Sequence, residues 1–322
     1  MLYRSKIISA AHNPAGIRIA FLQPDSSTIQ AARFLQDNTS ITPILIGNSF
    51  SLHDISDKIR ISLKDIEIIN IKSIIFNRPQ KEIVIDPIII EILNNFKNDE
   101  IYNNPLLLHL GIASSGIADS YFAPYDIDLW KLIQSINPEL GHRISGFHLV
   151  HSDSQQKTML FSDTCINAYP SAETLAETAI RSGHNFTSIT GETAKVALLS
   201  FSTKGSAKHE LPAIVQQAVD IVKQKAPSLI IDGEIQFDAA AVPEIAEQKA
   251  PGNSLNGEAN VFVFPNLNSA RIGYQIIRSI AGYLACGGFI QGLNFPLIFT
   301  DYTTNYMELT EAALIAAVYK NH

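Results

Sequence analysis

The chain has 322 residues, and its 46% hydrophobic and 17% charged content predicts about two domains with large buried cores rather than a disordered chain. The net charge of −7, with basic residues spread along the sequence, argues against a surface for nucleic acid or for an anionic membrane. Two cysteines, Cys165 and Cys286, are too few for a secreted disulfide framework, so a cytoplasmic protein is expected.

Short apolar runs predict buried strands of a parallel sheet, and helical periodicity fills the gaps between them. The strands are expected at 17–21, 44–46, 66–71, 106–110, 196–201, 229–231, 261–264 and 295–299. Helices are expected from the N-cap Ser171 to Gly183, over the amphipathic stretch 211–222, over 272–284 and over 309–319. This alternation of strands and helices predicts an α/β fold.

Residues 279–300 carry no charged side chain and are long enough to be considered as a membrane-spanning helix. Four glycines, together with Gln291, Asn294 and Pro296, interrupt this stretch. We therefore expect the end of a buried helix, a glycine turn and a buried strand at 295–299, and no membrane association.

The segment 142–156 alternates like a strand and then becomes a polar turn, unlike the strand–helix pattern before it. A second domain is therefore expected to begin near residue 140.

Common nucleotide and metal motifs are missing from the sequence, including GxGxxG, GxxxxGK[ST], HExxH and CxxC. His148 and His151 are the closest pair of histidines, but a spacing of three places them on opposite faces of a strand. No metal site is expected there. Cys165 and Cys286 have no basic neighbour in sequence, so both are expected to be inert buried thiols.

The turn Ser202-Thr203-Lys204-Gly205-Ser206 follows a predicted strand and precedes the strongly periodic helix. Backbone N–H groups, hydroxyls and one ammonium can converge at such a place and hold a phosphate. A plain helix start with a serine cap would have similar residues, so the phosphate interpretation and the structural one both remain open.

Two carboxylates, Asp232 and Glu234, follow the next predicted strand, again at the end where α/β proteins place their sites. They could bind a metal, act as an acid and a base, or cap a helix and form ion pairs. The structural interpretation is preferred because no partner for chemistry is evident nearby in sequence.

Longer stretches of the sequence resemble the phosphate acetyltransferases and phosphate butyryltransferases. The similar segments are SFSTKGSA, IDGEIQFDAAAVPEIAEQKAPG, GEANVFVFPNL with the following GY, and, upstream, SGFHLV with MLFSDTCINAYPSAETLAETAI. GIADS at Gly116–Ser120 and ILIG at Ile44–Gly47 resemble further family segments. The resemblance is dense over 144–298 and thinner over 15–125.

The resemblance implies two α/β/α domains of the isocitrate/isopropylmalate dehydrogenase-like type with an interdomain cleft. The first domain would comprise 1–142 plus 297–322, and the second, 143–296, would carry the dimer contact and the phosphate loop. It also implies a homodimer that moves a short acyl group, first of all acetyl, between coenzyme A and phosphate. Coenzyme A would be a substrate, and neither a bound cofactor nor a metal is implied.

The residues after the last strand depart from the family pattern. Asp301 stands where the family has a serine, Tyr302 where it has an arginine, and Glu308 where it has the catalytic aspartate. Glu308 can still serve as the base, whereas a tyrosine offers neither positive charge nor a bidentate fork for phosphate. Asp301, Tyr302 and Glu308 are the catalytic candidates.

Phosphate and coenzyme A are expected to contact the turn 202–206 and a few further residues. Lys131 partly replaces an arginine of the family, and Arg271 and Gln275 stand where the family has an asparagine and a lysine. An alternative function is a catalytically weak or inactive paralogue that binds coenzyme A, acyl phosphate or a protein partner. A decarboxylating dehydrogenase of the same fold is disfavoured because the sequence shows no clear carboxylate cluster for its metal.

Overall fold

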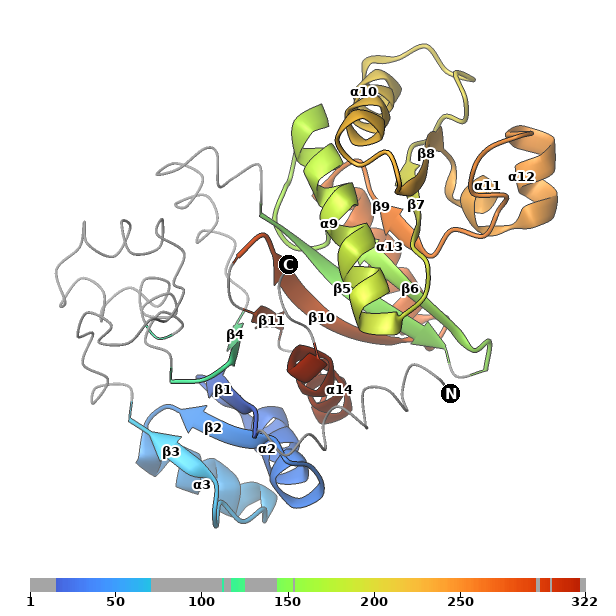
Figure 1. The fold of residues 1–322 in the computed structure, drawn as a ribbon. Helices are drawn as coiled ribbons and strands as arrows, with labels where there is room; N and C mark the ends of the chain where they lie inside the picture. The colour runs from blue at the N-terminus through green and yellow to red at the C-terminus, as the bar shows by residue number, and fades with distance from the viewer. Residues whose placement is uncertain are drawn as a thin grey trace, which may run out of the picture. The chain divides into compact units, whose positions relative to one another are not determined.

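The computed structural model describes residues 16–70, 112, 117–124, 144–152, 154–293, 296–301 and 303–318. The chain forms two compact units: Met1–Asn137 with Leu293–Asn321 make unit 1, and Pro138–Gly292 make unit 2. Each unit has its own strands, helices and buried core (Figure 1).

Unit 1 is built on parallel strands in the order β3-β2-β1-β4-β11. Their bounds are Arg18–Leu22 (β1), Thr42–Ile46 (β2), Glu67–Ile69 (β3), Ser120–Pro124 (β4) and Leu297–Thr300 (β11). The pairing of Leu297 with Tyr121 brings the C-terminal part of the chain into the sheet of the N-terminal part.

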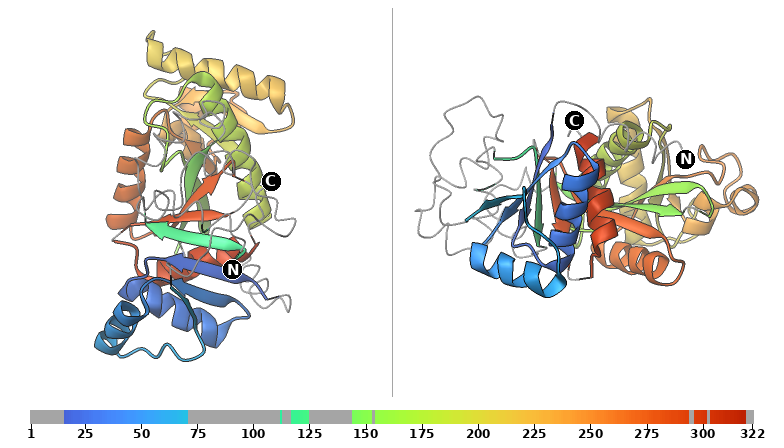
Figure 2. Two further views of the ribbon diagram at one scale, coloured as in Figure 1. Left: turned by 90° about the vertical axis from the view of Figure 1, so that its left-hand side faces the viewer. Right: turned by 90° about the horizontal axis from the view of Figure 1, so that it is seen from below.

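The helices of unit 1 are Ser26–Asn38 (α2), Ser49–Ile59 (α3) and Tyr306–Val318 (α14) within the described residues. Polar N-caps start the first two: Asp25 accepts the N–H of Thr28, and Asn48 accepts the N–H groups of Phe50 and Ser51. Figure 2 shows α14 beside α2, so the last described helix packs against the first.

Unit 2 has the strand order β10-β5-β6-β9-β7-β8. The bounds are Ser145–Ser152 (β5), Lys157–Ser162 (β6), Lys195–Leu199 (β7), Ile230–Ile235 (β8), Val261–Val263 (β9) and Leu284–Gln291 (β10). The pairs β10/β5 and β5/β6 are antiparallel, whereas β6, β9, β7 and β8 run parallel.

Helices cover both faces of the parallel strands of unit 2. They are Ala172–Thr190 (α9), Glu210–Lys225 (α10), Phe237–Ala241 (α11), Pro243–Lys249 (α12) and Leu267–Ser279 (α13). α9 packs against α10 and crosses the strands in Figure 1. Residues of α11 and α13 share one core with the strand side chains Phe161, Leu199 and Phe262. The strands therefore separate an α9/α10 layer from an α11/α13 layer.

The predicted α/β class is confirmed, and most predicted strands are present. β1, β2, β3, β7, β8, β9 and β11 lie at or next to the expected apolar runs. The expected strand at 106–110 lies outside the described residues. β4, β6 and β10 had not been predicted as strands, because their runs are short or contain polar and glycine residues. β5 lies within the segment 142–156, whose alternation had indicated a strand.

The expectation that a helix ends at Gly183 is wrong, since α9 continues to Thr190 and ends at Gly191. A Cβ atom on Gly183 would lie 2.8 Å from Cδ1 of Leu229 and 3.2 Å from Cγ2 of Val196. This glycine allows the helix to approach the sheet closely, whereas Gly191 has the positive φ of a helix C-terminus.

The helix expected at 272–284 is also wrong in its bounds. α13 begins at Leu267, because the Asn266 side chain accepts the N–H of Ser269, and it ends at Ser279. Leu284 already starts β10, which pairs with β5, so the expected glycine turn is a strand. None of the described helices combines the length and hydropathy needed to cross a bilayer.

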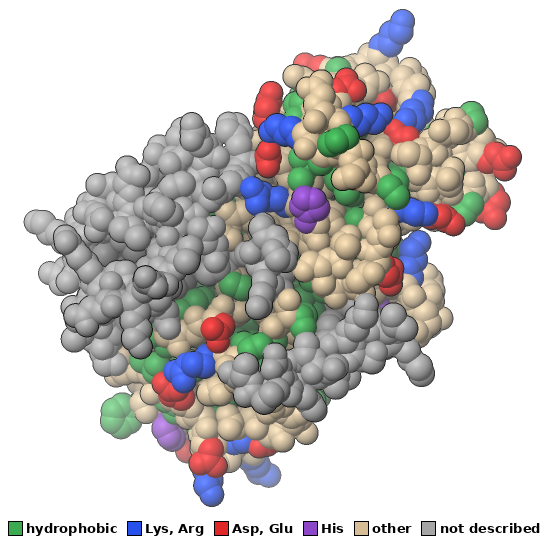
Figure 3. Space-filling model, in the orientation of Figure 1, with side chains coloured by type: hydrophobic (Ala, Val, Ile, Leu, Met, Phe, Trp, Pro, Cys, Tyr) green, Lys and Arg blue, Asp and Glu red, His purple; other side chains and the backbone are tan. Residues whose placement is uncertain are grey.

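Surface charges are mixed. On the face shown in Figure 3, Lys and Arg side chains lie among Asp and Glu side chains over the described part of the surface. Several form ion pairs in unit 2, such as Lys225 with Glu177 and Lys249 with Asp238.

Two glycines of the loop before β9 provide a test of packing. Gly252 and Gly257 both have a positive φ, but only Gly257 is crowded: its Cβ would lie 2.4 Å from Val242 C and Pro243 N. Gly252→Ala should lower the free energy of unfolding by about 1–2 kcal/mol, the cost of a left-handed alanine. Gly257→Ala should cost about 1–3 kcal/mol more through overpacking. Urea unfolding measures both, and equal losses would contradict the predicted difference.

Candidate functional site

The turn 202–206 lies where it was expected, after β7 and before α10. Lys204 and Gly205 have φ values of 53° and 80°, so the backbone turns sharply here. This turn lies next to the end of β8, because the Lys204 N–H donates to the carbonyl oxygen of Glu234 at 3.1 Å. Two motifs that are separate in sequence thus form one corner of unit 2.

The turn holds the carboxylate of Glu234. Oε1 of Glu234 accepts the Ser202 hydroxyl at 2.6 Å and the Gly205 N–H at 2.9 Å. Oε2 accepts Nε2 of Gln216 from α10 at 2.7 Å. Glu234 is 1% exposed. The hydroxyl and backbone donors that the sequence suggested for an external phosphate therefore bind an internal anion.

The other residues of the turn complete the same network. The Ser206 hydroxyl accepts the N–H of Thr203 at 3.0 Å, and the Thr203 hydroxyl accepts the N–H of Gln236 at 3.0 Å. Lys204 forms an ion pair with Asp232, which also accepts the N–H of Ser254. Asp232 and Glu234 thus have structural partners, in line with the preferred interpretation of this pair.

Hydrogen bonds keep both of these carboxylates ionised. Burial by itself raises the pKa of Glu234, but the bonds from Ser202, Gly205 and Gln216 outweigh burial and bring the pKa below its ordinary value. For Asp232 burial is again the largest single effect, and Lys204 with the N–H groups of Ser254 and Gly233 lowers the pKa overall. Each carboxylate is bound as an anion.

A second anchored loop follows β6 and was not identified from the sequence. Asp163 is buried, and its two carboxylate oxygens accept the backbone N–H groups of Gly146, Cys165, Ile166 and Asn167, at 2.8–3.0 Å. Burial raises the pKa of Asp163. The sequence signal was present in the SDTCIN segment, where an aspartate precedes several small polar residues.

Cys165 lies in this loop and is an inert thiol. Burial, followed by the charge of Asp163, raises its pKa to about 12, and the charge of Arg271 acts in the opposite direction. Arg271, on α13, therefore lies within electrostatic reach of the loop after β6. Gln275 lies one helical turn further along α13 and is exposed.

The catalytic candidates of unit 1 lie at the start of α14. Asp301 accepts the N–H and the hydroxyl of Thr303 through Oδ1, at 2.8 and 2.5 Å. Asn305 accepts the N–H of Glu308 at 3.1 Å, and Glu308 Oε2 in return accepts the N–H of Asn305 at 3.1 Å. This reciprocal pair is a capping box, and it fixes the buried Glu308 side chain at the first turn of the helix.

The structure thus groups the candidates differently from the sequence. The turn 202–206 lies with Asp232 and Glu234 in unit 2, and Asp301 lies with Glu308 at one helix start in unit 1. Tyr302 and Lys131 lie outside the described residues.

No group of three or more His, Cys, Asp or Glu side chains with metal-binding geometry is found among the described residues. His148 and His151 have separate partners: Nδ1 of His148 bonds to Thr164 Oγ1 at 2.8 Å, and Nδ1 of His151 bonds to Thr158 Oγ1 at 2.9 Å.

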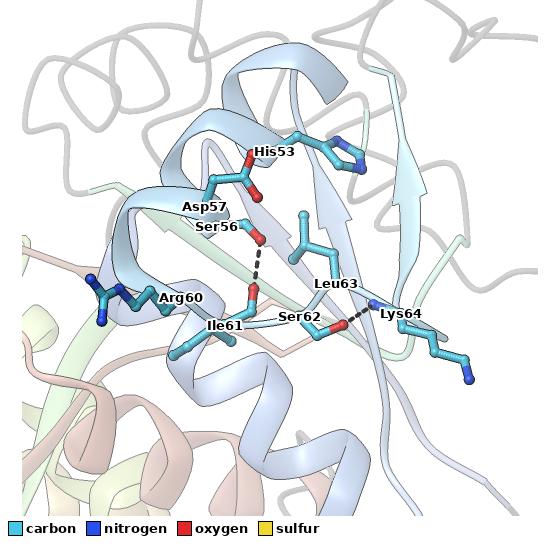
Figure 4. Close-up of a pocket in the computed structure, with 8 residues that line it drawn as sticks. All are labelled: His53, Ser56, Asp57, Arg60, Ile61, Ser62, Leu63 and Lys64. Carbon is cyan, nitrogen blue, oxygen red and sulfur yellow. Dashed lines mark hydrogen bonds between the residues drawn. The ribbon is translucent and has the colours of Figure 1, made fainter.

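A cavity of 460 Å³ lies at the C-terminal end of α3 in unit 1 (Figure 4). It is lined by charged and polar side chains, including His53, Arg60 and Lys64. Figure 4 shows Arg60 and Lys64 pointing to opposite sides, so their charges do not converge on one point. This cavity is not a candidate for phosphate binding.

The Glu234 network predicts a pH dependence of stability. Its pKa is lower in the folded state than the unfolded value of about 4.3, so the unfolded state binds more protons in this range. The stabilisation is complete above that pH and is lost as the pH falls through the folded pKa. Glu234→Gln should lower the free energy of unfolding at pH 7 by about 1–3 kcal/mol and reduce its decline below pH 4.

The matched control for Glu234→Gln is Glu247→Gln, which changes an exposed carboxylate on α12 of the same unit. It should leave the unfolding free energy and its pH profile as in the wild type. Urea titrations between pH 3 and 7 measure this, and identical profiles for wild type and Glu234→Gln would refute the role of the buried anion.

Comparisons with known proteins agree along nearly the whole chain. The family model for Phosphate acetyl/butaryl transferase matches residues 4–317. A phosphate acetyltransferase of Staphylococcus aureus is 37% identical over 289 residues, which cover 85% of each chain. One from Staphylococcus epidermidis is 35% identical over 292 residues, again 85% of each chain.

Solved structures show the same fold. The EutD phosphotransacetylase from Staphylococcus aureus matches with a TM-score of 0.75 at 30% identity, covering 98% of this chain and 97% of the other. A phosphotransacetylase from Streptococcus pyogenes matches with a TM-score of 0.78 at 28% identity and the same coverage. The chain therefore belongs to the phosphate acetyl/butyryl transferase family.

Proposed function

We propose that this protein transfers a short acyl group, most simply acetyl, between coenzyme A and phosphate. The observation that carries the proposal is the similarity to phosphate acetyltransferases at 37% identity over 85% of both chains. The protein is an acyltransferase, and coenzyme A is its substrate rather than a bound cofactor.

The reaction needs a base and groups that hold a leaving phosphate. A carboxylate removes the thiol proton of coenzyme A, and the thiolate sulfur attacks the carbonyl carbon of the acyl phosphate. The carbon–oxygen bond to phosphate then breaks, and phosphate leaves with the electron pair. Donors that stabilise the oxygen charges in the transition state supply much of the rate.

Glu308 is the base in this proposal, and Asp301 and Tyr302, which precede α14, are the other two catalytic candidates. Its support is the burial of Glu308 and the capping box with Asn305, which hold the carboxylate in one orientation.

Phosphate and coenzyme A contacts are proposed for the turn 202–206 and for Lys131, Arg271 and Gln275. In the turn, Glu234 already occupies the donors of Ser202 and Gly205. The Lys204 side chain is 39% exposed, so a phosphate could reach its ammonium from solvent.

A homodimer is also proposed, and α13 offers a surface for it. Ile272, Ile276 and Ile280 follow one another at intervals of four residues, and each is more than half exposed. Such a spacing forms an apolar ridge on one side of a helix, which is costly to leave in water.

We propose two domains, one formed by residues 1–142 plus 297–322 and the other by residues 143–296. We also propose that the protein is cytoplasmic. The compact units, which divide near residues 137 and 293, support these boundaries. The buried thiols Cys165 and Cys286 fit a reducing compartment.

Substitution of the proposed base tests the mechanism. Glu308→Gln should lower kcat by about 10²–10⁴-fold, because a carboxamide cannot accept the thiol proton. It should leave the melting temperature nearly unchanged, because glutamine also completes a capping box. The assay follows release of free coenzyme A thiol from acetyl-CoA and butyryl-CoA in the presence of phosphate.

Asn305→Ala is the matched control for Glu308→Gln. It removes the cap and should cost about 0.5–2 kcal/mol of stability while the Glu308 carboxylate remains. If Glu308→Gln keeps the kcat of the wild type, Glu308 is not the base and only caps the helix. Absence of turnover in the wild type, with coenzyme A still raising the melting temperature, would favour the binding paralogue instead.

The dimer contact can be tested on the α13 ridge. Ile276→Asp places a charge in the proposed interface and should raise the dimer Kd by at least about 30-fold, the effect of losing one interface hot spot. Gln224→Asp adds the same charge to an exposed position of α10 and should leave the protein as a dimer, with the sedimentation behaviour of the wild type. Sedimentation velocity measures this, and a monomeric wild type would disprove the dimer.

A further inference from the structure

A buried aromatic stack joins α13 to β5 in unit 2. The imidazole of His148, on β5, lies against the ring of Tyr274, on α13, with the ring centroids 4.2 Å apart and the planes inclined by 23°. His148 is 7% exposed and Tyr274 3%. Because stacked rings prefer a defined relative position, this pair restrains α13 against rotation about its own axis.

The same histidine is bonded to the loop after β6. Its Nδ1 lies 2.8 Å from Oγ1 of Thr164, which is fully buried. The N–H of Thr164 donates to the carbonyl oxygen of Gly146, on β5, at 2.9 Å. The carboxylate of Asp163 accepts further backbone N–H groups from this loop and from Gly146. His148 therefore connects three parts of unit 2, which are β5, α13 and the loop after β6.

α13 also approaches the strands closely at the residue before Tyr274. A Cβ atom on Gly273 would lie 3.0 Å from Cε1 and 3.2 Å from Cζ of Phe264, which follows β9. The glycine thus allows the helix backbone to lie directly on this ring. With Gly273 against Phe264 and Tyr274 against His148, the helix makes close contacts at two successive positions.

Arg271 lies one helical turn before Tyr274. Residues three positions apart on an α-helix share a face, so the two side chains project toward the same part of unit 2. Burial, followed by the charge of Asp163, raises the pKa of Cys165, and the charge of Arg271 acts to lower it. The guanidinium of Arg271 therefore lies close to the loop after β6.

The loop after β6 and the start of α13 lie at one edge of the sheet of unit 2. β6 and β9 are parallel neighbours, and the chain leaves the carboxyl end of the first toward the loop and that of the second toward α13. Open α/β sheets bind their ligands at this edge. An arginine there binds a phosphate group through a bidentate fork, and it binds best when its orientation is fixed beforehand.

We propose that the stack of His148 on Tyr274 positions Arg271, through α13, to bind a phosphate group of a substrate. This inference rests on the proposed function, in which the phosphate group belongs either to inorganic phosphate or to coenzyme A. Both stacked rings are buried, so they do not touch the substrate. They are positioning residues, and Arg271 makes the contact.

The test measures kcat and the KM values for inorganic phosphate and for acetyl-CoA with the full chain, by release of free coenzyme A thiol. Arg271→Gln should raise at least one of the two KM values about tenfold, the effect of losing one hydrogen bond to a charged group, with kcat within about threefold. The substrate with the larger rise in KM is the one whose phosphate group Arg271 binds. Lys223→Gln removes the same charge from an exposed position of α10 and should keep both KM values of the wild type.

Two substitutions of His148 isolate the stack. His148→Leu removes the ring and should raise the same KM at least about threefold, because Arg271 is still present but is no longer held in place. His148→Phe retains a ring against Tyr274 and should restore this KM to within about twofold of the wild type. Both variants lose the bond to Thr164, so the difference between them measures the stack alone. A purely structural role of His148 would lower the melting temperature and leave both KM values unchanged.

Three outcomes would overturn the proposal. The first is that Arg271→Gln keeps the wild-type KM for both substrates, and the second is that His148→Leu does. The third is an equal rise in KM in His148→Leu and His148→Phe. If His148→Leu does not fold, His148→Gln takes its place, because the amide can bond to Thr164 but has no ring, and it should raise the KM in the same way.

The same variants distinguish a failure of this inference from a failure of the proposed function. Absence of turnover in the wild type would refute the transferase function. The Kd values of coenzyme A and of inorganic phosphate, measured by calorimetry, then replace the KM values. The same ratios among the variants are expected, and equal Kd values in the wild type and in Arg271→Gln would refute the positioning of Arg271.

Discussion

A buried carboxylate must be hydrogen-bonded, and this requirement determines the corner of unit 2 where β7 and β8 end. Glu234 is enclosed by Ser202, Gly205 and Gln216, which come from a turn, its backbone and a helix. Removal of one donor would leave part of the charge of the buried Glu234 carboxylate without a hydrogen bond. This cost keeps the turn 202–206, β8 and α10 together. The Lys204–Asp232 ion pair closes the same corner nearer to solvent. The loop is thus preorganised without any ligand.

Sequence patterns predicted much of this fold, because apolar runs and caps act over short distances. The strands β7 and β9 and the amphipathic helix α10 follow directly from their periodicity. Gly183 was taken for a helix end because only tertiary contact, here with Leu229 and Val196, distinguishes a packing glycine from a terminal one. The partners of Ser202 could not be predicted either, since Glu234 lies 32 positions away in sequence.

At the candidate site, too, the sequence pattern alone does not determine the role of a residue. The pattern Asn305-x-x-Glu308 is a capping box by local rules, and Glu308 is also the position that the family resemblance assigns to the base. Local structure satisfies the first role without excluding the second, because a carboxylate has several lone pairs and can accept more than one hydrogen bond. The spacing of residues in the sequence therefore cannot distinguish a structural carboxylate from a catalytic one. The hydrogen-bond donors around the carboxylate show only how its side chain is oriented.

Polar contacts between residues distant in sequence also explain β10, a strand of unit 2 that the sequence pattern did not predict. β10 contains two adjacent glycines and a buried Gln291, so it has neither a continuous apolar run nor a clean alternation. Gln291 Nε2 donates to Ser145 on β5 at 2.7 Å and to Ser182 on α9 at 3.0 Å, and its Oε1 accepts from Asn185 at 2.7 Å. These bonds satisfy a side chain that is 1% exposed and join β10 to β5 and to α9. A fully bonded glutamine specifies one packing of strand and helix where apolar contacts alone would tolerate several, because any shift would leave buried donors without acceptors.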